Sequence, residues 1–148
     1  MASKGCNMFY KPLLLPLLAL VLLTFVVWVY MYVTRLSEIK RKSINPQAHD
    51  TRAHDQALLT DSPEAADNLK NLFELPILFY VAILLALVLM VQDQGLVQLA
   101  WSYVALRYLH SLVHCTYNRV MHRFTAYVAS CLVLMLIWAR LAAYVLMN

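Results

Sequence analysis

Charge is scarce in this sequence. Asp, Glu, Lys and Arg make up 14% of its 148 residues, whereas hydrophobic residues make up 62%. Soluble domains carry about 25% charged residues, so this composition argues against a soluble domain and indicates a protein whose solvent is lipid. Cysteine is scarce too, and Cys6, Cys115 and Cys131 form no Cys-x-x-Cys pair. The sequence therefore gives no sign of a disulfide framework.

Four stretches are nearly free of charge and long enough to cross the ~30 Å hydrocarbon core of a bilayer. They lie at residues 13–33, 72–91, 96–113 and 124–147. The first holds no charged side chain, the second only Glu74, and the third Arg107 together with His110. A backbone inside lipid must satisfy its own hydrogen bonds, so we expect helices. The predicted fold class is an all-α membrane protein, a four-transmembrane-helix bundle that forms one domain over residues 1–148.

Lys and Arg are concentrated in two of the three connections between these spans. The segment at about 35–66 holds five of them, and the connection between the third and fourth spans holds Arg119 and Arg123. The connection around Asp93 holds none. Because basic loops stay on the cytoplasmic side, we expect these two loops in the cytoplasm and both termini outside. The net charge of +4 then serves topology and contact with anionic lipid, not nucleic acid.

The second helix is predicted to begin before its span. Ser62, Pro63 and Glu64 supply an N-cap, a first-turn proline and an acid suited to the positive end of the helix dipole. Further along, Pro76 removes the hydrogen bond that would satisfy the carbonyl of Leu72, which predicts a kink or an exposed acceptor there.

Polar side chains recur at helical spacing on the second and third helices. On the second helix, Asp67, Asn71 and Glu74 share one face. On the third helix and beyond it, spacings of three, four and four residues form one stripe of Arg107, His110, His114 and Asn118. Because an ionised group inside the membrane must be paired or solvated, we expect the two stripes to face each other, with Arg107 opposite Glu74. The same polar contacts could instead do no more than hold the helices together.

With the arginines of the following turn, the two stripes would form a cationic pocket for a small anionic ligand from the cytoplasm. These arginines are Arg119 and Arg123. His110 and His114 are an i, i+4 pair that could bind zinc, but the sequence has no HExxH motif and no third ligand at fixed spacing. We therefore expect no metal.

Three short segments resemble the MAPEG family, the membrane-associated proteins of eicosanoid and glutathione metabolism, which include the microsomal glutathione transferases. They are Asn71-Leu-Phe-Glu74-Leu-Pro76, Arg107-Tyr-Leu-His110, and residues 118–123. The resemblance covers most of the chain in length, number of spans and motif positions. It implies a homotrimer of four-helix bundles that binds glutathione between neighbouring subunits, toward the cytoplasm.

The resemblance also implies residue roles. Asn71 and Glu74 match the residues that hold the polar backbone and amino group of glutathione, and Arg107 matches the arginine of the third helix. Arg123 is the better match for the arginine that stabilises the glutathione thiolate, with Arg119 as the competing assignment. Such a thiolate would attack an electrophile dissolved in the membrane or reduce a lipid hydroperoxide.

Two positions depart from the family's pattern. The glutathione-conjugating members carry an arginine where this chain has Asp67, and several members carry a tyrosine where it has His114. An acid at this position would weaken binding of an anionic tripeptide, and Lys70 is no fork-shaped replacement for arginine.

The sequence therefore leaves two functions open. One is a glutathione-dependent transferase or peroxidase that acts on lipophilic electrophiles or hydroperoxides. The other is a non-catalytic membrane protein that binds another small anion or a lipid, in a structural or regulatory role. A small transporter is disfavoured, because the spans show no broken inverted repeats.

Overall fold

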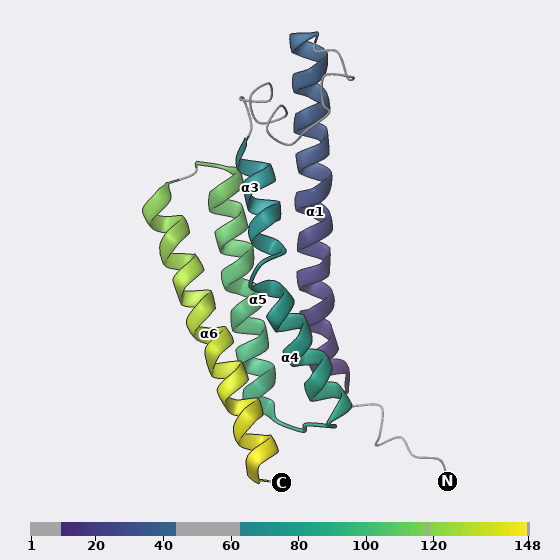
Figure 1. Cartoon of the computed structure of the whole chain (residues 1–148), viewed down its shortest axis with the longest axis vertical. Helices are drawn as coiled ribbons and strands as arrows, with labels where there is room; N and C mark the ends of the chain where they lie inside the picture. Colours follow the sequence, from purple (N-terminus) through teal and green to yellow (C-terminus); the bar gives the residue numbers. More distant parts are fainter. Residues whose placement is uncertain (1–9, 44–62, 118, 148) are drawn as a thin grey trace, which may run out of the picture.

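The structure is a computed structural model that describes residues 10–43, 63–117 and 119–147. These ranges contain helices and no strand. The helices are α1 (Tyr10–Lys42), α3 (Pro63–Leu72), α4 (Pro76–Val88), α5 (Gln94–Cys115) and α6 (Val120–Met147). The chain passes up along α1, down along α3 and α4, up along α5 and down along α6 (Figure 1). The all-helical architecture predicted from the sequence is confirmed.

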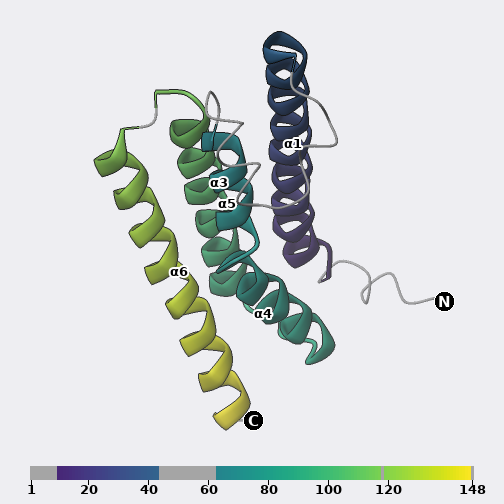
Figure 2. The ribbon, with the colours of Figure 1, turned by 45° about the horizontal axis from the view of Figure 1, so that its top comes forward.

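α5 occupies the middle of the bundle. It packs against α6, α1 and α3, and in both views α1 and α6 lie on opposite flanks (Figures 1 and 2). The beginning of α1, the α4–α5 connection and the end of α6 lie at one end of the bundle, and the α5–α6 connection lies at the other end (Figure 1). A helix so enclosed can carry polar side chains that lipid would not tolerate.

The second span is broken at the proline, as its sequence predicts. α3 ends at Leu72 and α4 begins at Pro76, where the missing amide of a first-turn proline costs least. Turn-type hydrogen bonds bridge the break, from the Phe73 amide to the Lys70 carbonyl and from the Leu78 amide to the Leu75 carbonyl, each 3.0 Å long. The break sets Glu74 in a turn between two helices.

Three helical stretches of the described chain are long and apolar enough to cross a membrane. They are Pro12–Lys42, Glu64–Val88 and Val120–Met147. α5 is not among them, because Gln, Ser, His and Arg side chains along it lower its hydropathy. Its 22 residues nevertheless extend about 33 Å at 1.5 Å per residue. The structure thus shows three membrane-capable helices, and a fourth crossing by α5 stays a prediction.

The bundle interior is apolar and closely packed. Leu20, Phe79, Ala100 and Ile137 have 0% exposure, and they belong to a core that joins all four helical passages. Small buried residues such as Ala100 let neighbouring helices approach closely, as in other membrane bundles. The outer surface is also apolar, with Phe25 61% exposed, which suits lipid and not water.

One ion pair joins the beginning of α5 to the end of α6. The carboxylate of Asp93 accepts a hydrogen bond from the Gly95 amide at 2.8 Å and so caps α5. The same carboxylate binds Arg140 through Nε and through Nη2, the latter at 3.0 Å. The hydrogen bond from Arg140 holds the pKa of Asp93 below its usual range. The α4–α5 connection, which carries no cation, is therefore tied to α6 by this ion pair.

Asp93→Ala should lower the free energy of unfolding in detergent by about 0.5–2 kcal/mol, because it removes the cap of α5. Asp93→Asn keeps an acceptor for the cap and should cost less. Because the pKa is depressed in the folded protein, the ion-pair contribution is fully present above the unfolded value of ~3.9 and is lost as the pH falls through the folded value. Thermal unfolding between neutral and acidic pH tests this, with Gln92→Ala as the control. Equal losses for the two Asp93 variants would contradict a role for the cap.

Candidate functional site

Three polar residues of α5 share one fully enclosed face. Arg107, His110 and His114 have exposures of 0%, 2% and 2%, and their spacing of three and four residues places them one above another. Residues of α6 contact all three side chains. Of the stripe predicted on the third helix, Arg107, His110 and His114 therefore share one face inside the helix bundle.

The guanidinium of Arg107 is held between aromatic rings. Its Nε donates to the hydroxyl of Tyr103 at 3.1 Å. Its central carbon lies 5.4 Å from the ring centroid of Tyr103 and 5.1 Å from that of Tyr127, within the range of cation–π attraction. Nη1 and Nη2 are buried and have no hydrogen-bond partner among the described residues. A buried guanidinium with two open donors points to a ligand or partner group that the described residues do not supply.

The first turn of α6 closes over the two histidines. His110 Nδ1 lies 3.0 Å from the backbone carbonyl oxygen of Arg123, and Nη1 of the same arginine donates to His114 Nε2 at 3.1 Å. The two imidazole rings meet edge to face, with centroids 5.6 Å apart. His110 Nε2 and His114 Nδ1 are buried without a partner in the part of the chain that is described. We call Arg107, His110, His114 and Arg123 the basic cluster.

We expected the stripe of Asp67, Asn71 and Glu74 to face the polar stripe of α5. The structure does not show this arrangement. Asp67 and Glu74 are exposed and Asn71 is half-buried. Among the described residues no ion pair joins Glu74 to Arg107. The stripe instead lies on an exposed side of α3 and of the break that follows it.

The face of α3 that packs on α5 belongs to Asn68, which is fully buried. Its Nδ2 donates to Cys115 Sγ at 3.3 Å, and its Oδ1 accepts from the Ser111 hydroxyl at 3.2 Å. Asn68 is one residue from Asp67, hence about 100° around the helix. Asn68 and Ser111 were not predicted from the sequence, although Ser111 and Cys115 lie at i, i+4 on α5.

Two tyrosines beside the basic cluster were not predicted as site residues. Tyr103 and Tyr127 contact Arg107 directly, and Tyr103 also stacks on Phe79 with ring centroids 4.6 Å apart. The signal for both was their spacing, because Tyr103 precedes Arg107 by four residues and Tyr127 follows Arg123 by four.

The remaining predicted site residues lie near the α5–α6 turn. Arg119 is exposed, and its carbonyl accepts a hydrogen bond from the Arg123 amide at 3.1 Å. Asn118 lies outside the described residues. Within the described ranges no three His, Cys, Asp or Glu side chains gather in a way that could hold a metal ion.

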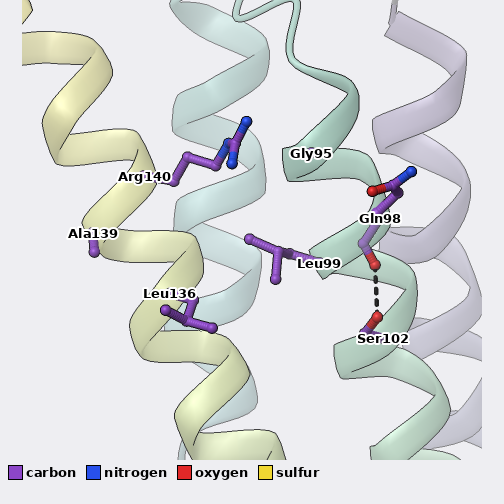
Figure 3. Close-up of a pocket in the computed structure, with 7 residues that line it drawn as sticks. All are labelled: Gly95, Gln98, Leu99, Ser102, Leu136, Ala139 and Arg140. Atoms are coloured by element: carbon purple, nitrogen blue, oxygen red, sulfur yellow. Dashed lines mark hydrogen bonds between the residues drawn. The ribbon is translucent and has the colours of Figure 1, made fainter.

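Grooves of the described chain also lie outside the basic cluster, and two of them are large. The first, of about 610 Å³, runs between α5 and α6 near the Asp93 end of the bundle (Figure 3). Its lining residues are Gly95, Gln98, Leu99, Ser102, Leu136, Ala139 and Arg140, and it includes none of the predicted site residues. The second, of about 360 Å³, is apolar and lies between α1 and the α3–α4 break. Its lining residues are Val21, Thr24, Phe25, Trp28, Phe73 and Tyr80. This second groove adjoins the predicted stripe, because Phe73 precedes Glu74.

The comparisons with known proteins give one result. The sequence profile of the MAPEG family matches residues 13–143, nearly the whole chain. No curated protein and no solved structure matches the chain.

The hydrogen bond between Asn68 and Ser111 can be tested by a double-mutant cycle. Asn68→Ala should lower the free energy of unfolding by about 1–3 kcal/mol, because it leaves the buried Ser111 hydroxyl without its acceptor. Ser111→Ala should cost less, and the coupling between the two changes should be about 0.5–1 kcal/mol. Ser102→Ala is the matched control, since that exposed hydroxyl bonds only the Gln98 carbonyl of its own helix. Strictly additive losses would contradict the interaction.

Proposed function

Because this chain belongs to the MAPEG family, we propose that it is a membrane-bound, glutathione-dependent transferase or peroxidase that acts on lipophilic electrophiles or hydroperoxides. Family membership by itself supports a role in glutathione or eicosanoid metabolism at a membrane. The observation that carries the finer proposal is the buried guanidinium of Arg107, whose Nη1 and Nη2 have no partner among the described residues.

An anion would satisfy this guanidinium. Leaving a buried charge without a partner costs several kcal/mol, and a carboxylate accepts two parallel hydrogen bonds from an arginine fork. Glutathione carries two carboxylates and one amino group, so it can place an anion at Arg107 and its amino group near Glu74 and Asn71. The basic cluster would then bind one end of the ligand, and the exposed stripe of Asn71 and Glu74 would bind the other end.

Arg123 is the residue we propose for thiolate stabilisation. A free thiol with a pKa near ~8.5 is mostly protonated at neutral pH, and a nearby guanidinium favours its ionised form. Arg123 is half-buried and bonded to His114, whereas Arg119 is exposed. The fixed position of Arg123 within the basic cluster favours it over Arg119.

We further propose that the protein is a four-span bundle that assembles as a homotrimer. Asp67 and Glu74 are exposed and Asn71 is half-buried in a single copy of the chain, and a neighbouring subunit would cover this stripe. The charge pattern of the connections favours the cytoplasmic side for this site and the outer side for both termini. The apolar groove beside Phe73 opens between exposed aromatic side chains such as Trp28, and it would admit a lipophilic substrate from the bilayer.

Asp67 favours a second candidate function. It places an exposed acid on α3, in the stripe that would hold the ligand, where it opposes an anionic tripeptide. A non-catalytic protein of the same fold, with a structural or regulatory role, would bind another small anion or a lipid there. Glutathione binding separates the two candidates.

Glutathione at a hundred times its dissociation constant should stabilise the detergent-purified protein by ~2.7 kcal/mol, measured by thermal unfolding. Arg107→Ala should abolish this shift, because it removes the buried anion partner. Arg123→Ala should keep most of the shift and abolish conjugation of a generic hydrophobic electrophile. The matched control is Arg119→Ala, which should conjugate normally.

The absence of any shift at millimolar glutathione in the wild-type protein would reject the proposed function. Loss of binding in Arg123→Ala would reassign that residue from thiolate stabilisation to anchoring. Loss of conjugation in Arg119→Ala, with Arg123→Ala active, would exchange the two roles.

Asp67→Arg should tighten glutathione binding by up to about fivefold, because interactions between exposed charges are worth ~0–1 kcal/mol. Asp67→Asn should give an intermediate affinity, since it removes the repulsion without adding a cation. Isothermal titration in detergent measures the three dissociation constants. An unchanged or reversed order would favour a ligand other than glutathione and hence the second candidate function.

A further inference from the structure

The hydrogen bonds of the basic cluster fix the tautomers of both histidines. A backbone carbonyl can only accept a hydrogen bond, so the contact of 3.0 Å with the Arg123 carbonyl requires that His110 Nδ1 carry a hydrogen. In a neutral ring, His110 Nε2 then holds a lone pair. This nitrogen is buried and has no partner among the described residues.

His114 has the opposite arrangement. A guanidinium can only donate, so its contact of 3.1 Å with Nη1 of Arg123 makes His114 Nε2 the acceptor. His114 is therefore neutral, and its hydrogen is on Nδ1, which is also buried without a partner in the described chain. Two rings 5.6 Å apart thus present an open acceptor and an open donor.

The open atoms of the cluster define what a ligand must bring. Three are donors, namely Nη1 and Nη2 of Arg107 and Nδ1 of His114, and one is an acceptor, Nε2 of His110. A complementary ligand offers anionic oxygens to the donors and a single hydrogen to the acceptor. A thiol that also carries carboxylates has this composition.

We propose that His110 is a catalytic residue, the base that takes the proton from the thiol of the bound cosubstrate. This inference rests on the proposed function, because it requires glutathione in the cluster. The S–H bond breaks, its proton moves to His110 Nε2, and the electron pair stays on sulfur. With an electrophilic alkene, the thiolate forms a C–S bond and the imidazolium returns its proton to the carbon that gained the electron pair.

The charges around His110 favour protonation of the imidazole only when a thiolate forms beside it. The rings of His114 on α5 and Tyr127 on α6 have centroids 5.6 Å and 5.8 Å from that of His110. Arg107 lies three residues before it on the same face of α5, and Arg123 contacts its Nδ1 through the backbone carbonyl. The acids Glu64 and Asp67 lie on α3, which packs on this part of α5 through Asn68. An imidazolium alone would be repelled by the two guanidinium groups. A proton that comes from the thiol leaves a thiolate beside them, so the cluster keeps its net charge during the transfer.

His110→Asn tests the proposal, because its amide can still donate to the Arg123 carbonyl but offers no basic nitrogen. The variant should bind glutathione about as well as the wild-type protein, by thermal shift, yet lose the ultraviolet absorbance of the bound thiolate at neutral pH. Its kcat should fall by about 10²–10⁴ and recover as the pH rises past the thiol's own pKa of ~8.5. His122→Asn, on the exposed side of α6, is the matched control and should change neither signal.

A second measurement needs no variant. If His110 takes the proton, glutathione binding at neutral pH releases almost no proton to the solvent, whereas stabilisation by arginine alone releases about one proton per thiolate formed. Calorimetry in buffers of different ionisation enthalpy gives this number. Persistent thiolate absorbance in His110→Asn, or release of about one proton by the wild-type protein, would overturn the role of His110 with the proposed function intact. No binding of glutathione by the wild-type protein would overturn both.

Discussion

The arrangement of the bundle depends on one buried charge. Arg107 has no exposed surface, and a guanidinium at this depth is tolerated only when it faces the interior and finds polar or aromatic partners. Tyr103 and Tyr127 supply such partners, but neither neutralises the charge. α5 must therefore be enclosed by α1, α3 and α6, and the apolar residues of those outer helices face the lipid. Enclosure also excludes water from the histidines. Each hydrogen bond that they make is therefore electrostatically stronger than it would be in water.

The fold could be predicted well where a single physical rule decides it. Long stretches without charge admit only helices in lipid, and Pro76 breaks its helix because it has no amide to donate. Helix ends were less predictable. α1 continues to Lys42, well past the expected boundary at Val33, because hydropathy marks where lipid ends and not where the backbone hydrogen bonds end. The polar side chains of α5 likewise weaken its apolar signal although its helix is unbroken.

The site could be predicted within a helix but not between helices. The 3.6-residue period correctly placed Arg107, His110 and His114 on one face, since that spacing is a property of α5 alone. The period could not tell which face of α3 would be buried. Asn68 and Asn71 are both amides three residues apart, and packing against Ser111 and Cys115 selects Asn68. That choice depends on side chains more than 40 residues away, for which a local pattern carries no information.

Arg123 shows how the pattern within one helix and the packing between helices combine at the site. From one position in the first turn of α6, it offers His110 a carbonyl that only accepts and His114 a guanidinium that only donates. Two chemically identical side chains, four residues apart on one helix, thereby receive opposite tautomers. A shift of α6 by one residue would rotate both groups of Arg123 by about 100° and break both contacts. The position of α6 relative to α5 therefore determines which open histidine nitrogen accepts a hydrogen bond and which one donates. Any chemistry at this site depends on that turn as much as on the charge of its arginines.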